Sequence, residues 1–144
     1  MTPPRYLTET FAVSSQIGLE DLDDLKALGF KTIVCNRPDG EVPEELSAAN
    51  MERACRELGL EFVMNPLSHG SLSPDHIEIQ RKAATSDGPV LAYCASGNRS
   101  SILWGLAMAG THTTEDILNR TTAAGYNLQA LVPQLDAIAA CSAG

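Results

Sequence analysis

Short apolar runs alternate with helical segments along this chain, and this order restricts the folds that it can adopt. The apolar runs cover residues 6–16, 30–36, 60–66 and 89–94. A segment with helical signals follows each run, and two more helices complete the chain. Strands that alternate with helices form a parallel sheet with helices packed on both faces. The sequence therefore predicts a three-layer α/β fold around a central, mostly parallel sheet.

The helices are indicated by their capping residues and by the spacing of their apolar side chains. Four leucines, Leu19, Leu22, Leu25 and Leu28, recur every third residue and predict an amphipathic helix with an acidic outer face. The segment after Arg99 is apolar nearly all round, which predicts a central, buried helix. The other predicted helices run over about 43–58, 74–84, 114–124 and from 128 onward.

Composition restricts the class of protein and its surroundings. The 144 residues suffice for one domain, 1–144, and 44% of them are hydrophobic. No apolar run approaches the roughly 20 residues of a membrane span, and the first residues do not resemble a signal peptide. The net charge of −8 disfavours nucleic acid and anionic membranes as partners.

The four cysteines show neither a C-x-x-C pair nor the spacing of a zinc site. Without an export signal, we expect reduced thiols in a cytoplasmic protein. Cys35, Cys55 and Cys141 are expected to be buried small hydrophobes, the usual place of a free cysteine. The sequence predicts neither a metal nor a cofactor.

Three loops are expected to meet at one edge of the sheet, because sites in such sheets form at the carboxyl ends of the strands. These loops cover residues 37–41, 68–71 and 94–99. The third loop joins a continuous apolar run to the buried helix. This loop begins with a cysteine and ends with an arginine, and this pair of residues makes it the candidate functional site.

The loop between Cys94 and Arg99 carries the groups of an anion site. Its intervening residues are small or compact: Ala95, Ser96, Gly97 and Asn98. They let backbone N–H groups turn inward as an anion-binding nest, and the following helix adds its positive N-terminal dipole. Arg99 adds a planar fork for an oxyanion, and a cysteine in these surroundings is expected to be a thiolate. The alternative is that Cys94 is a core thiol and Arg99 a surface residue.

Protein tyrosine and dual-specificity phosphatases carry a Cys-x-x-Gly-x-x-Arg-Ser/Thr loop, which residues 94–100 resemble with one residue fewer. A closer resemblance is to the beta-lactamase-hydrolase-like family, a bacterial phosphatase-like domain that is also described as a sulfurtransferase. It rests on "FAVSSQIGLEDLDDLKALGFKTIVCNRPDGE", "FVMNPLSHGSLSPDHI" and "GPVLAYCASGNRSSILWGLA", from Phe11 to about Ala109. The resemblance implies a protein-tyrosine-phosphatase-like fold with a nucleophilic cysteine.

Two departures from these families bear on the reaction. Ala95 stands where the family usually has a basic residue, and the loop after the third strand lacks the general-acid aspartate of dual-specificity phosphatases. The cysteine and arginine are separated by four residues, as in rhodanese-type sulfurtransferases, rather than by the five of phosphatases. The four-residue spacing and the missing acid favour sulfur transfer through a persulfide on Cys94, whereas the resemblance in fold favours a phosphatase. The alternative is a phosphatase with a phosphocysteine, and a third hypothesis is a non-catalytic anion or persulfide sensor.

Two residues are candidates for the missing acid. His69 is either a general acid or anion contact, or a turn residue packed near the loop. Asp39 is either a displaced general acid or part of the turn that "PDG" indicates. In each hypothesis the partner is a small anionic substrate, and the oligomeric state stays open.

Three more residues have two possible roles each. Arg37 either supplements Arg99 at the anion site or pairs with a carboxylate on the surface. Ser100 follows the arginine as in phosphatases, where this hydroxyl aids departure of the thiolate, and it is also a candidate helix N-cap. Cys35 is either a resolving thiol or a buried core residue.

Overall fold

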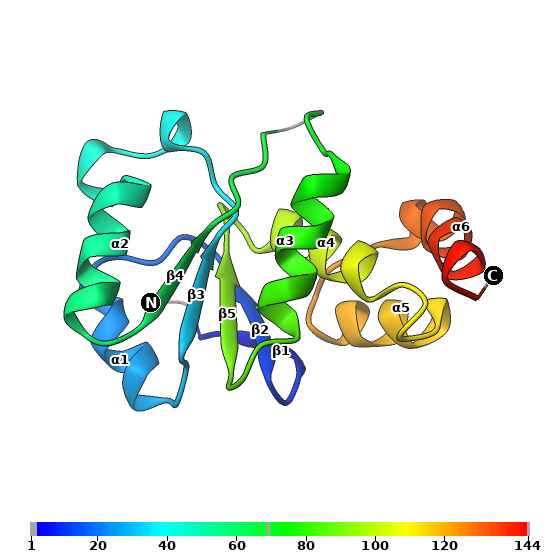
Figure 1. Ribbon diagram of the computed structural model, residues 1–144, viewed down its shortest axis with the longest axis horizontal. Coiled ribbons are helices and arrows are strands. Elements are labelled where there is room, and N and C mark those ends of the chain that lie inside the picture. The colour runs from blue at the N-terminus through cyan, green and yellow to red at the C-terminus, as the bar shows by residue number, and fades with distance from the viewer. Residues whose placement is uncertain (1–2, 69, 144) are drawn as a thin grey trace.

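A five-stranded sheet divides the molecule into layers (Figure 1). The computed structural model describes residues 3–68 and 70–143. The strands are β1 (Arg5–Thr8), β2 (Phe11–Ser14), β3 (Thr32–Cys35), β4 (Glu61–Met64) and β5 (Val90–Tyr93). The helices are α1 (Asp21–Ala27), α2 (Ala48–Glu57), α3 (Pro74–Ala84), α4 (Asn98–Met108), α5 (Thr114–Ala123) and α6 (Val132–Ala143), with short 3₁₀ turns η1 (Asp39–Glu41), η2 (Glu44–Leu46) and η3 (Gln129–Leu131).

The strand order is β1-β2-β5-β3-β4, and every neighbouring pair except β1 with β2 is parallel. The predicted three-layer fold with a central, mostly parallel sheet is therefore confirmed. The first apolar run forms two strands rather than one, because Thr8 to Phe11 reverses the chain into an antiparallel pair at the sheet edge. β5 and β3 lie between other strands, which explains their continuous apolar sequences.

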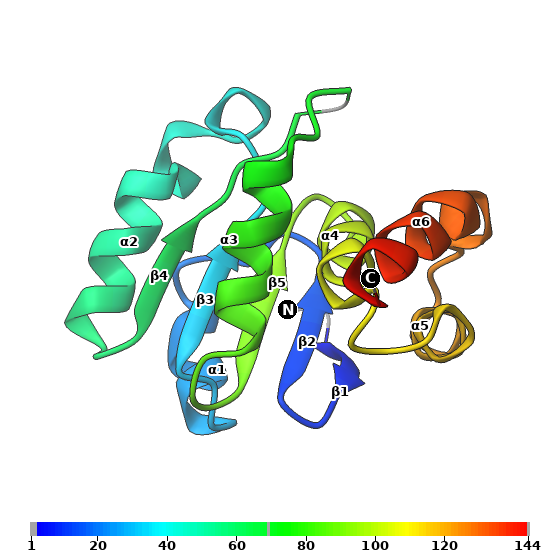
Figure 2. The same cartoon turned by 45° about the vertical axis from the view of Figure 1, so that its right-hand side comes forward.

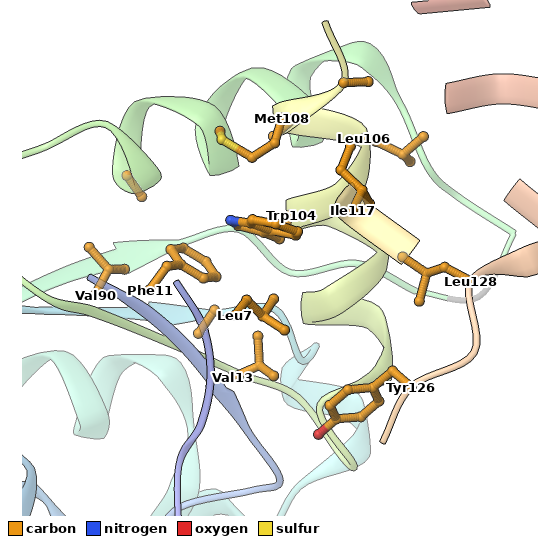
Figure 3. Packing of buried hydrophobic residues seen from close by; sticks show 14 of the residues in the cluster. Leu7, Phe11, Val13, Val90, Trp104, Leu106, Met108, Ile117, Tyr126 and Leu128 are labelled. Carbon is orange, nitrogen blue, oxygen red and sulfur yellow. The ribbon is translucent and has the colours of Figure 1, made fainter. Parts of the chain in front are cut away.

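Each face of the sheet has its own core. Helices α1 and α2 cover one face, and α3 and α4 cover the other, with α5 and α6 packed outside α4 (Figures 1 and 2). On the α4 side, Trp104 packs with Phe11 and Leu7 at the centre of the cluster (Figure 3). The prediction of a central, buried helix after Arg99 is confirmed, since nine of the 11 residues of α4 are buried.

The first predicted helix is shorter than its leucine pattern suggests. Leu22 and Leu25 are fully buried, but Leu19 is 37% and Leu28 57% exposed, so the expectation for these two was wrong. A spacing of three residues falls about 60° short of a full helical turn at each step, so the outer leucines rotate off the buried face. Helix α1 also begins only at Asp21, whose carboxylate accepts a hydrogen bond from the Gly18 N–H at 2.7 Å.

The second predicted helix begins five residues later than expected from Pro43. Two 3₁₀ turns precede it, and α2 begins at Ala48 with Ser47 as N-cap. By contrast, the prediction for α3 is confirmed in full. Ser73 caps its N-terminus, Pro74 is its first residue, and His76 completes a capping box.

The cysteines divide into buried and exposed positions. Cys35 and Cys55 are buried as predicted, and burial raises the pKa of Cys55 to about 11. Cys141 is exposed, so its expected burial was wrong. It lies near the end of α6, one turn beyond Ile138, the last α6 side chain that packs on the core. Within the described residues, no helix has the length and apolarity that a membrane crossing requires.

Candidate active site

Cys94 follows the last residue of β5 and lies at the edge of the sheet where the parallel strands β3 and β4 also end (Figure 2). The Cys94 N–H continues the pairing with β2 by donating to the Ser14 carbonyl at 3.3 Å. The side chain is only 1% exposed. Its sulfur accepts a hydrogen bond from the backbone N–H of Gly97 at 3.1 Å. The loop therefore curls around the sulfur.

Gly97 is required by both the backbone and the packing of this loop. Its φ of +95° lies in the left-handed region, where residues with a Cβ are strained. A Cβ at this position would also lie 2.1 Å from the Tyr126 hydroxyl oxygen. Gly97 is the N-cap of α4, which begins at Asn98. Ser100 is therefore the third residue of the helix, and its candidate role as N-cap was wrong.

The carbonyl groups of the loop have partners outside the ring that surrounds the sulfur. The Ala95 carbonyl accepts from the Gln16 N–H at 3.4 Å, and the Ser96 carbonyl accepts from the Tyr126 hydroxyl at 2.9 Å. The Gly97 carbonyl accepts from the N–H and the hydroxyl of Ser101, both at 2.9 Å. Because these carbonyls are engaged elsewhere, the loop's N–H groups can face an anion above the sulfur, except that of Asn98, which donates to the Ser96 hydroxyl at 3.3 Å.

Tyr126 supports the loop from the α4 side of the sheet. Its ring packs in the core, while its hydroxyl points away from the rest of the cluster (Figure 3). Burial raises the pKa of Tyr126, so the phenol stays protonated and donates to Ser96. The Arg5 guanidinium lies over the ring, 5.4 Å from its centroid.

Arg99 lies in the first turn of α4 and is 6% exposed. Its Nη1 and Nη2 donate to the two carboxylate oxygens of Glu41, at 2.9 and 2.7 Å. Nη1 also donates to the Leu67 carbonyl at 2.8 Å. A bidentate, charge-assisted pair of this kind fixes the plane of the guanidinium. Arg99 thus connects the loops that follow β3, β4 and β5.

Arg99 and Glu41 shift each other's pKa. Hydrogen bonds from Arg99, together with the nearby Arg37, hold the pKa of the Glu41 carboxyl below its usual value of 4.5. The pKa of Arg99 is raised, mainly by Glu41 and in addition by Cys94, while burial opposes the shift. Glu41 was not among the predicted site residues, although it ends the quoted "NRPDGE" piece.

Arg37 pairs with Glu41, as one of its two predicted roles requires. Its Nε lies 3.3 Å from Oε1 of Glu41, and its Nη1 donates to the Gln16 side chain at 3.1 Å. Through Glu41 it belongs to the same charge network as Arg99. Its direct contact with a bound anion stays a prediction.

The Ser100 hydroxyl is buried beneath the loop and donates to Oδ1 of Asn36 at 2.9 Å. The Asn36 amide in turn donates to the Asn65 carbonyl at 3.1 Å and to the Gln80 side chain at 3.2 Å. A buried polar network that is this well connected rigidifies its surroundings. It fixes the start of α4 against β3 and β4.

The remaining candidates lie at different places. Asp39 is exposed in η1, and its carboxylate accepts a hydrogen bond from the N–H of Ala48, the first residue of α2, at 2.8 Å. His69 lies outside the described residues. General acid catalysis by either residue stays a prediction. In the described ranges, no group of three or more His, Cys, Asp or Glu side chains is placed to hold a metal ion.

Cys35 is buried at the end of β3, and its thiol donates to the Arg37 carbonyl at 3.2 Å. Burial raises its pKa, which keeps the sulfur protonated and weakly nucleophilic. In the sheet Cys35 pairs with Tyr93 on the neighbouring strand β5, and Cys94 is the residue that follows Tyr93.

The chain is similar to known proteins over most of its length. A family profile described as "Beta-lactamase hydrolase-like protein, phosphatase-like domain" matches residues 4–111. A beta-lactamase hydrolase-like protein of Agrobacterium fabrum is 30% identical over 133 residues, 90% of this chain and 31% of that protein. One from Xylella fastidiosa is 31% identical over 102 residues, 70% of this chain and 24% of that protein. The chain spans less than a third of these relatives' length.

Solved structures extend the comparison to the fold. A Neisseria meningitidis protein described as a "putative phosphatase" is 32% identical and superimposes with a TM-score of 0.77, covering 92% of this chain and 96% of that one. The structure named Tk-PTP in its active form has a TM-score of 0.72 at 20% identity, covering 96% and 98%. At this lower identity the likeness concerns the fold alone.

Proposed function

Because the chain belongs to the phosphatase-like domain family of beta-lactamase hydrolase-like proteins, we propose that it is a cysteine-dependent phosphatase for phosphate monoesters. The observation that carries this proposal is the arrangement around Cys94. The Gly97 N–H contacts the sulfur, the loop carbonyls have partners outside the ring, and Arg99 is fixed beside it. This arrangement suits an anion held directly above a nucleophile.

In the proposed reaction the Cys94 thiolate attacks phosphorus, so that a P–S bond forms while the bond to the ester oxygen breaks. The loop N–H groups and Arg99 hold the phosphoryl oxygens, where negative charge must be stabilised. The leaving oxygen takes a proton from Asp39, His69 or water. Water then attacks the phosphocysteine, releasing phosphate and the thiolate.

Sulfur transfer, which the sequence favours, remains a second candidate because four residues separate Cys94 from Arg99. A persulfide needs room for one sulfur atom, whereas a phosphoryl group needs donors for three oxygens. The family and the Neisseria structure favour the phosphatase. A non-catalytic sensor would bind the anion without multiple turnover.

Turnover assays with the purified protein distinguish the three candidates. We expect hydrolysis of p-nitrophenyl phosphate that is lost in Cys94→Ser and retained in Cys141→Ser, whose thiol is exposed near the C-terminal end of α6. Parallel incubation with thiosulfate and cyanide tests sulfur transfer. Thiocyanate production without phosphate release would contradict the phosphatase, and adduct formation without turnover would support a sensor.

A further inference from the structure

A pocket lies at the opposite edge of the sheet from the Cys94 loop, where β2 and β5 begin and α3 and α4 end (Figure 2). Its volume is about 520 Å³, within the range of about 300–1,000 Å³ that is usual for small-molecule sites. Helix α4 separates the pocket from the anion site, because Met108 in its wall is about 14 Å along the helix from Arg99. No step of the proposed reaction uses this pocket.

The most deeply buried residues that line the pocket are apolar. They are Phe11, Trp104 and Met108. Phe11 and Trp104 also pack on each other, with their ring centroids 6.4 Å apart. Aromatic rings and a thioether make favourable contacts with another flat ring. The inner surface of the pocket therefore suits a planar ligand.

Trp104 contributes an unpartnered hydrogen-bond donor to the pocket. The residue is 1% exposed, and no group in the described part of the chain accepts a hydrogen bond from its indole N–H. Asn65 and Tyr93 hold the side-chain polar atoms that are sealed from solvent without a partner, and the indole nitrogen is not one of them, so it is reached from the pocket. Figure 3 shows the nitrogen at the end of the ring that points towards Phe11. A buried donor without an acceptor costs free energy, so a ligand that offers an acceptor oxygen here gains affinity.

The charged groups around the pocket leave no net positive charge for an anion. Arg120, in the wall, donates from Nε to Asp116 at 2.9 Å, and Nδ1 of His112 lies 2.8 Å from the same oxygen. Glu9, in the turn between β1 and β2, forms an ion pair with none of the described cations. The whole chain carries a net charge of −8. An uncharged ligand therefore suits the pocket better than an anion.

Threonine hydroxyls supply the other polar groups of the pocket. The threonines that line it are Thr8, Thr10, Thr85 and Thr111. A hydroxyl both donates and accepts hydrogen bonds, so these side chains can contact the carbonyl oxygens and the ring nitrogens at the edge of a heterocycle. Together with the apolar residues and the indole N–H, they fit a flat molecule with a polar edge.

We propose that this pocket binds an uncharged, planar heterocycle with a ring carbonyl, the chemical class of the nucleobases, whose carbonyl oxygen accepts a hydrogen bond from the Trp104 indole N–H. The ring lies against Phe11 and Met108, and its polar edge meets the threonine hydroxyls. The site is separate from Cys94, so this inference does not rest on the proposed phosphatase function.

The chain has a single tryptophan, so the indole N–H gives one signal in the NMR spectrum of the ¹⁵N-labelled protein. The probe is caffeine, an uncharged, planar heterocycle with ring carbonyls. We expect caffeine to move the indole proton signal downfield, because the N–H gains an acceptor, with a dissociation constant of about 1 mM that is usual for a ligand of this size. A signal that stays in place at about ten times this concentration, or that moves upfield, would overturn the proposal.

Variants that fill the pocket locate the binding. Thr111→Phe places a ring in the pocket from the turn between α4 and α5, and it should weaken caffeine binding by about tenfold or more. Thr85→Phe does the same from the end of α3, and it serves if circular dichroism shows that the first variant misfolds. Thr122→Phe, at an exposed residue of α5 outside the pocket, is the matched control and should bind like the wild type. Unchanged affinity in a folded pocket variant, or an equal loss in the control, would contradict the site.

Two further titrations test the ligand class and the separation from the anion site. Theophylline-7-acetate has the ring system of caffeine with a carboxylate added, and we expect it to bind several-fold more weakly because of Glu9 and the negative charge of the chain. Equal or tighter binding would show that Arg120 attracts an anion and would overturn the uncharged class. Cys94→Ser should bind caffeine like the wild type, and a loss of binding in this variant would place caffeine at the Cys94 loop and overturn the pocket.

Discussion

Glu41 determines the orientation of the Arg99 guanidinium. A carboxylate that binds two guanidinium nitrogens at 2.7 and 2.9 Å holds a flexible side chain in one orientation. In the proposed phosphatase reaction, the N–H groups of Arg99 that do not bind Glu41 or Leu67 would meet a phosphoryl oxygen beside Cys94. We therefore propose that Glu41 is a positioning residue, which contributes through Arg99 rather than by touching the substrate.

Replacing Glu41 by glutamine keeps the shape of the side chain but removes its charge. We expect kcat/KM for p-nitrophenyl phosphate to fall about tenfold, because hydrogen bonds to charged groups are worth about 1.5–3 kcal/mol and one of the two is lost. Glu44→Gln, an exposed change in the neighbouring 3₁₀ turn, should leave kcat/KM unchanged. A gain of activity in Glu41→Gln would mean that the carboxylate competes with the substrate.

At the scale of elements, the unit β5–loop–α4 depends on a glycine that no other residue replaces. Gly97→Ala adds a Cβ at a φ of +95° and brings it against Tyr126. We expect the free energy of unfolding to fall by about 1–3 kcal/mol in denaturant titrations. Adding Tyr126→Phe should recover only part of this loss, because the backbone strain remains. Gly40→Ala, with open space around it, should change little; full recovery in the double variant would contradict the strain.

Elements with local signals were predictable from the sequence, and those set by distant contacts were not. Ser73 and Pro74 determine the start of α3, and the apolar run before Cys94 determines β5. The start of α2 has a local cap, Ser47, which the prediction from Pro43 missed, and an additional long-range bond from the Ala48 N–H to Asp39, nine residues away, which capping rules do not include. The Arg99–Glu41 pair joins residues 58 positions apart. Cys94 and Arg99 share one short loop, so sequence reasoning brings them together but misses Glu41 and Tyr126.

At the scale of the whole molecule, the Glu41–Arg99 pair connects the two sides of the sheet. Glu41 belongs to the segment that leads into α2, which packs on one face, and Arg99 begins α4 on the other. The buried Ser100 hydroxyl also joins α4 to Asn36, directly after β3. The candidate site therefore lies where side chains connect the two layers. We expect its charge state to change the free energy of unfolding.

The pH dependence of unfolding measures this link. Arg99 holds the Glu41 pKa below its usual value of 4.5, so the carboxylate stabilises the folded state at higher pH. This contribution is complete above pH 4.5 and is lost as the pH falls through the lowered pKa of the folded protein. The difference in unfolding free energy between wild type and Glu41→Gln should be constant near neutral pH and shrink below pH 4.5. Glu44→Gln should follow the wild type throughout. A difference that stays constant to low pH would show that the Glu41 charge does not contribute.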